Sequence, residues 1–201
     1  YWLVGKTSES TRNTLQESLL GAIGNFGTGM IPKECIGKIT TRHGTPGAVD
    51  TVWVKFMRNG EWTGEWSTIG FKSADQKPAS FFGTVMDSVH LDEPTDELVY
   101  NECLMRTATT QGKMLHTLTP KEGLTRMIAD YLATAEFLAG SEKLPNLDLA
   151  KAIMLQDGKK YEDGEGTPNK EAKTSRAVIT IGWDDIPWLP EDEKERIIAA
   201  T

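Results

Sequence analysis

The sequence predicts an α/β fold: a mostly parallel β-sheet flanked by helices, with a β-hairpin insertion and a small C-terminal subdomain. Short apolar, β-branched segments alternate with helical patterns, and turn residues follow the segments. The exception is 49–72, where two β-rich segments flank Asn59-Gly60, a hairpin turn signal. The pattern changes after residue 140, so we expect a core at 1–140 and a subdomain at 141–201.

Each element of the core has a local reason in the sequence. Tyr1–Val4 is wholly apolar and is expected as a short buried strand. Ser8–Leu20 begins with serines that can cap a helix and carries leucines on one face, which predicts a helix. The glycines between 21 and 29 predict a loop. The remaining core elements are expected as a strand near 36–40, hairpin strands at 49–57 and 66–72, a turn at 78–83, strands at 87–91 and 113–118, and helices at 97–106 and 125–138.

The helix at 97–106 is expected to turn Leu98, Cys103 and Leu104 inward.

The C-terminal subdomain has weaker patterns. Its expected elements are a helix at 146–156, a charged loop at 157–173, a strand at 177–183 and a charged helix at 190–200.

The composition argues against several classes of function. Hydrophobic residues make up 38% of the 201 residues, and no apolar run approaches the ~20 residues of a membrane-spanning helix. The net charge of −7 argues against a general polyanion binder, so any contact with DNA needs a local basic patch. Cys35 and Cys103 are far apart and the histidines are scattered, which gives little support for a zinc site.

The segment Val89–Glu93 is the strongest candidate for chemistry. An apolar strand that ends in Asp and Glu is the Walker B arrangement, in which the first carboxylate holds Mg²⁺ through water and the second activates the attacking water. Asp92 is therefore the candidate metal residue and Glu93 the candidate catalytic base. Apolar strands also end in Asp-Glu by chance, and then the two side chains are merely solvated.

A second strand supplies polar residues that we expect near the same place. The strand at 113–118 ends in Thr119-Pro120. Ligands of doubly wound sheets bind beyond the carboxyl ends of the strands, so Asp92, Glu93, Thr117 and Thr119 are expected at one edge. A threonine beside a γ-phosphate can sense the nucleotide, whereas β-propensity and helix capping explain the threonines taken alone.

These blocks, in this order, resemble the large subunit of bacteriophage terminases. That family shows an apolar strand, Asp-Glu, a helix with Tyr-x-Glu, an arginine, a glycine, and a strand followed by Thr-x-Thr-Pro-x-x-Gly. The segments STRNTLQESLLG, FKSADQ and FFG, and WDDIPWLPEDEKERI near the end, also resemble family segments. The residues here that match the central run are Asp92, Glu93, Tyr100, Glu102, Arg106, Gly112, Thr117, Thr119, Pro120 and Gly123.

The resemblance implies an ASCE-type, RecA-like P-loop NTPase core that uses ATP and Mg²⁺ to drive double-stranded DNA into a procapsid. It implies a homo-oligomeric ring that works with the portal and the small terminase subunit, without a membrane, in the host cytoplasm. The nuclease domain of the family would lie beyond this chain. The implied roles are general base for Glu93, Mg²⁺ binding through water for Asp92, and coupling of hydrolysis to movement for Thr117, Thr119 and Pro120.

Gly5-Lys6-Thr7 matches the end of a phosphate-binding loop, but we do not expect it to be one. The residues before it, Tyr1–Val4, are bulky and apolar, whereas a phosphate loop binds the anion with bare backbone N–H groups. We expect a strand end that leads into the next helix and no cofactor-binding P-loop in this chain. Since the chain starts inside an apolar strand and without Met, the loop is expected upstream in a longer protein.

Alternatives remain open for Arg106 and for the whole chain. Arg106 is a candidate sensor or trans-acting arginine, and an ion pair with Glu102 is its simpler role. The main interpretation is an ATPase subunit of a packaging motor that is incomplete for turnover by itself. The alternatives are another ASCE ATPase, such as a helicase, and a catalytically silent assembly or binding subunit. A helicase would carry an arginine motif in a second RecA-like domain, and nothing after residue 140 resembles one.

Overall fold

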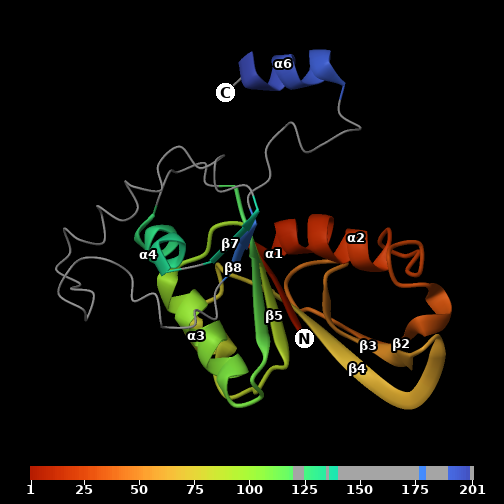
Figure 1. Cartoon of the computed structure of the whole chain (residues 1–201). Coiled ribbons are helices and arrows are strands. Elements are labelled where there is room, and N and C mark those ends of the chain that lie inside the picture. The colour runs from red at the N-terminus through yellow and green to blue at the C-terminus, as the bar shows by residue number, and fades with distance from the viewer. Residues whose placement is uncertain (120–124, 135, 140–176, 180–189, 200–201) are drawn as a thin grey trace. The chain divides into compact units, whose positions relative to one another are not determined.

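The computed structural model describes residues 1–119, 125–134, 136–139, 177–179 and 190–199 (Figure 1). The chain divides into two compact units, Tyr1–Pro120 and Lys121–Thr201. The domain boundary expected between 140 and 141 lies outside the described residues and stays a prediction. Within the described residues, no helix has the length and apolar character that crossing a membrane requires.

A six-stranded sheet organises the first unit, with the strand order β2-β3-β4-β1-β5-β6. β4, β1, β5 and β6 run parallel, whereas β2 and β3 are antiparallel to their neighbours. The mostly parallel sheet predicted from the alternation of elements is confirmed. The strands are β1 (Trp2–Gly5), β2 (Ile36–Thr41), β3 (Val49–Arg58), β4 (Glu61–Ser73), β5 (Ser88–Asp92) and β6 (Lys113–Thr117).

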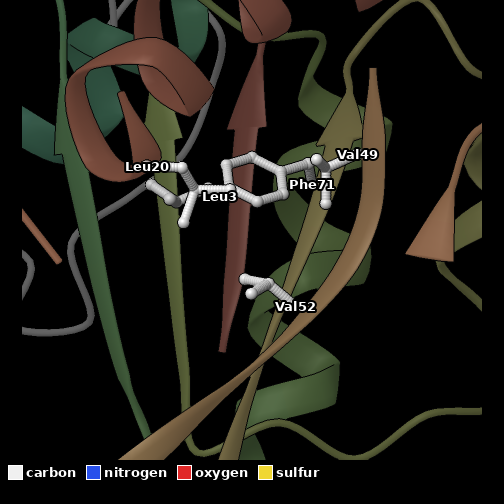
Figure 2. Packing of buried hydrophobic residues seen from close by; sticks show 5 residues of the cluster. All are labelled: Leu3, Leu20, Val49, Val52 and Phe71. Carbon is white, nitrogen blue, oxygen red and sulfur yellow. The ribbon is translucent and has the colours of Figure 1, made fainter. Parts of the chain in front are cut away.

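Helices lie on both sides of this sheet (Figure 1). The predicted helix at 8–20 forms as α1 (Ser8–Ser10), a π-helical segment (Thr11–Gln16) and α2 (Glu17–Leu20). Leu20 of this helix packs with four residues of the sheet in the apolar cluster of Figure 2, which consists of Leu3, Leu20, Val49, Val52 and Phe71. α3 (Glu97–Ala108) lies on the other side and forms the crossover that two parallel neighbours, β5 and β6, require.

Local signals explain where these helices begin and end. Thr7 caps α1 in a reciprocal capping box with Ser10, and the Asp96 side chain accepts a hydrogen bond from the Leu98 amide at the start of α3. α2 ends at Gly21, whose φ of 95° lies in the left-handed region that suits glycine.

The hairpin predicted at Asn59-Gly60 is confirmed. Both residues have positive φ, 53° and 84°, as the tight turn favoured by Asn-Gly requires. The returning strand starts at Glu61 rather than at Trp66, because the pairing of β3 with β4 continues to Arg58↔Glu61 beside the turn. β4 also pairs with β1, so the hairpin is part of the main sheet.

Two expectations about helices are wrong. Leu98 and Leu104 are 66% and 43% exposed, because the buried stripe of α3 follows the four-residue spacing of Val99, Cys103 and Thr107. The helix predicted at 125–138 is shorter: α4 spans Arg126–Thr134, and β7 (Glu136–Ala139) pairs in parallel with β8 (Ala177–Ile179).

The predicted C-terminal helix forms as α6 (Glu191–Ala199). The predicted helix at 146–156, the loop at 157–173 and residues 180–183 of the predicted strand lie outside the described residues.

Candidate active site

The carboxyl ends of β5 and β6 lie side by side. The two strands are parallel neighbours, and Asp92 is the register partner of Thr117. The Thr117 hydroxyl donates a hydrogen bond of 2.8 Å to Asp92 Oδ1. The sequence expectation that these two strands end at the same edge of the sheet is therefore met, and the edge is the one at which open α/β sheets bind ligands.

The chain bends at Glu93, directly after β5. Its φ of 73° lies in the left-handed region, a conformation that costs a residue other than glycine about 1–3 kcal/mol. Three hydrogen bonds hold its peptide groups: the Glu93 amide donates to Thr117 O (2.8 Å), and Glu93 O accepts from the Thr95 hydroxyl (3.2 Å) and His116 Nε2 (3.0 Å). The backbone of Glu93 is thus held by hydrogen bonds to β6 and to Thr95, which lies between β5 and α3.

The structure adds two histidines, His90 and His116, to this edge, although they are far apart in the sequence. His90 Nε2 lies 2.9 Å from Thr117 Oγ1, and His116, which stacks on Tyr100, bonds to Glu93 O. Their sequence signal was a single polar ring inside each of two apolar strands. Burial lowers the pKa of both rings; the Asp92 charge opposes this shift at His90, and the hydrogen bond to Glu93 opposes it at His116.

We expect acidification to destabilise the first unit through His116. Its pKa in the folded chain lies below the ordinary 6.5, so the unfolded chain takes up a proton at a higher pH than the folded chain does. The free energy of unfolding is therefore highest above the unfolded pKa and falls as the pH drops from 6.5 towards the lower folded pKa. Denaturant unfolding measured across this range should show a weaker pH dependence in His116→Gln than in the wild type.

The exposed His43 provides the control for this experiment. His43→Gln should leave the pH dependence like that of the wild type, because this exposed side chain is not buried on folding. Equal effects of the His43 and His116 substitutions would contradict the assignment of the acid sensitivity to His116.

The remaining predicted residues have different surroundings. Arg106 Nη2 lies 2.7 Å from Glu102 Oε1, four residues earlier on α3, so the structure shows the ion pair that was the simpler alternative. Thr119 is exposed just beyond β6, and Pro120 lies outside the described residues. The geometry thus gathers Asp92, Glu93 and Thr117 but does not bring Arg106 into hydrogen bonds with them.

Gly5-Lys6-Thr7 is a strand end followed by a helix, as expected. The strand before it is buried, and Thr7 is the N-cap of α1. Glycine is required at position 5 by close packing, since a Cβ there would lie 2.4 Å from Thr11 Oγ1.

The side chains of Asp92, Glu93 and Thr117 offer only oxygen atoms as metal ligands, and oxygen ligands suit a hard cation such as Mg²⁺. Asp92 offers a carboxylate whose Oδ1 is bonded to Thr117 and whose Oδ2 makes no hydrogen bond within the described part of the chain. No group of three or more His, Cys, Asp or Glu that could hold a metal occurs among the described residues. Mg²⁺ commonly needs only one or two carboxylates, with water and phosphate completing its shell, so the residues fit this ion.

Known proteins provide comparisons in sequence and in fold. The large terminase subunit of Salmonella phage P22 is 28% identical over 196 residues, which cover 96% of this chain and 39% of that protein. The large terminase ATPase domain of Thermus phage P74-26 superposes with a TM-score of 0.53 at 16% identity, over 98% of this chain and 68% of that one. A point mutant of that domain gives a TM-score of 0.51 at 15% identity. No family model matches the chain. The predicted fold class is confirmed.

Proposed function

We propose that this chain, which resembles bacteriophage terminase large subunits in sequence and has the fold of their ATPase domain, belongs to an ATP-hydrolysing motor subunit that drives double-stranded viral DNA into a procapsid. The observation that carries the proposal is the hydrogen bond between Asp92 and Thr117 at the carboxyl ends of β5 and β6, with Glu93 adjoining it. The chain spans 39% of the length of the P22 relative, so we assign turnover to the full-length protein.

In this proposal, different residues at this edge carry out different parts of ATP hydrolysis. Mg²⁺ bound with ATP supplies charge neutralisation on the phosphates. Asp92 would hold the ion through water, and Oδ2 is its more available oxygen because Oδ1 accepts the hydrogen bond from Thr117. Glu93 orients the attacking water and accepts its proton. We assign no phosphate-binding role to Gly5-Lys6-Thr7, because Thr7 is the N-cap of α1.

Hydrolysis is coupled to movement through the segment that follows β6. Thr117 bonds to Asp92 and thereby detects the state of the nucleotide, and Thr119 and Pro120 pass it along the chain. The partners in this proposal are double-stranded DNA, the procapsid portal, the small terminase subunit and further copies of this subunit in a ring, at the procapsid in the host cytoplasm.

ATP hydrolysis by the full-length protein tests this function. Asp92→Asn should reduce the Mg²⁺-dependent rate about 100-fold or more, because it removes the negative charge that holds the ion. The matched control is Asp87→Asn, since Asp87 is an exposed aspartate directly before the other end of β5. Phosphate release should be measured with and without linear double-stranded DNA.

The same assay separates the alternatives. A wild-type rate in Asp92→Asn would remove the assignment of the site. Stimulation by single-stranded nucleic acid together with duplex unwinding would indicate a helicase, and an intact full-length protein without hydrolysis would indicate a silent assembly subunit.

A further inference from the structure

We propose that His90 is a positioning residue that orients Asp92 through the Thr117 hydroxyl, an inference that rests on the function proposed above. His90 and Asp92 are two residues apart in β5, so their side chains point to the same face of the sheet. Thr117 is the register partner of Asp92 on β6. The three side chains form one hydrogen-bonded row, with 2.9 Å from His90 Nε2 to Thr117 Oγ1 and 2.8 Å from Thr117 Oγ1 to Asp92 Oδ1.

This row has only one arrangement of hydrogens. An ionised carboxylate only accepts, so the single hydroxyl proton of Thr117 lies towards Asp92 Oδ1. Thr117 Oγ1 must then accept from His90, and the imidazole must carry a hydrogen on Nε2.

The row orients the Asp92 carboxylate and makes one of its oxygens more available than the other. The hydrogen bond from His90 favours the hydroxyl rotamer in which Thr117 donates to Asp92 Oδ1, and this bond orients the carboxylate. Asp92 Oδ2, which makes no hydrogen bond within the described part of the chain, would be the more available oxygen for the water of a metal ion. Outer-shell hydrogen bonds of this kind change metal affinity by about 10–100-fold.

Core packing alone does not explain a histidine at this position. Val89 and Leu91, which flank it in β5, are fully buried and point to the opposite face. His90 lies on the same face as its register partner Leu115, which is 53% exposed. A leucine could occupy this partly covered place without the hydrogen bond. A packing role therefore predicts that His90→Leu leaves metal binding unchanged.

The test compares Mn²⁺ binding, measured by electron paramagnetic resonance with ATP present, in variants of the full-length protein. His90→Leu should weaken Mn²⁺ binding about 10-fold, because it removes the donor to Thr117. His90→Gln should restore most of the affinity, because its amide supplies an N–H donor at a similar distance. In a Thr117→Val background, His90→Leu should not weaken Mn²⁺ binding further, since the hydroxyl that joins His90 to Asp92 is already absent.

Two results would overturn the proposal: wild-type Mn²⁺ affinity in His90→Leu, and additive losses in the double variant. A measurement on the wild-type chain is independent of how the variants fold. Nuclear magnetic resonance of ¹⁵N-histidine should show His90 protonated at Nε2, and protonation at Nδ1 alone would also overturn it.

The Asp92→Asn variant distinguishes failure of this inference from failure of the proposed function. If Asp92→Asn binds Mn²⁺ and hydrolyses ATP like the wild type, the site on which the proposed function rests is wrongly assigned. If Asp92→Asn loses both properties while His90→Leu keeps them, only the role of His90 is wrong.

Discussion

Glu93→Gln in the full-length protein is expected to lower kcat for ATP hydrolysis about 100-fold or more while ATP binding is retained. The amide keeps the size of the side chain but cannot accept a proton from the attacking water. The left-handed backbone of residue 93 should persist, because the hydrogen bonds that hold it come from the Glu93 peptide groups and not from its carboxylate. Single-turnover hydrolysis and equilibrium binding of ATP measure the two effects separately.

Glu97→Gln provides the matched control, because Glu97 is exposed in the first turn of α3 and bears the same charge. It should hydrolyse ATP at nearly the wild-type rate. If Glu93→Gln also did so, Glu93 would not be the base, and the attacking water would be activated by a group outside the described edge.

Phe71→Ala is expected to destabilise the first unit by about 3–5 kcal/mol, the usual cost of truncating a buried phenylalanine. Phe71 is 2% exposed in the cluster with Leu3 and Leu20, where the helix of residues 8–20 meets β4 and β1 (Figure 2). Denaturant unfolding followed by tryptophan fluorescence measures the loss. β1 pairs with β4, which carries Phe71, and with β5, which ends at Asp92. The substitution should therefore also make the position of Asp92 less well fixed.

Phe82→Ala removes the same side chain from a position that is 58% exposed. Its effect should stay within about 0.5 kcal/mol, as for most surface substitutions. Comparable losses from the two phenylalanine substitutions would show that the cluster of Figure 2 does not dominate the stability of this unit.

The elements that the sequence predicted correctly depend on short-range signals. Asn59-Gly60 specifies its turn because both residues tolerate positive φ. The helix at 8–20 was predicted from its polar start, although its cap is Thr7, which bonds to an amide three residues away, and not one of the expected serines. The Asp-Glu pair was found in the same way, as the end of an apolar strand. Such signals act within a few residues, so the chain carries them whatever its tertiary fold.

The parts that the sequence did not predict depend on long-range contacts. The sequence could not decide whether Leu98 or Val99 lies on the inner face of α3. Both residues are apolar, and only the tertiary packing of the helix determines which one is buried. The pairing of Arg106 with Glu102 is by contrast a local contact between residues four apart on α3, and the sequence had already offered it as the simpler role of Arg106.

By itself the sequence determined the alternation of strands and helices, the hairpin turn, the acidic pair at the end of β5 and the likeness to phage terminases. The tertiary structure alone decided that β5 lies between β1 and β6 and that His90 and His116 contact Thr117 and Glu93. The physical reason is the range of the interactions. Periodicity, turns and caps act along the chain, whereas strand order and hydrogen bonds across the sheet join residues far apart in sequence, whose pairing no local pattern specifies.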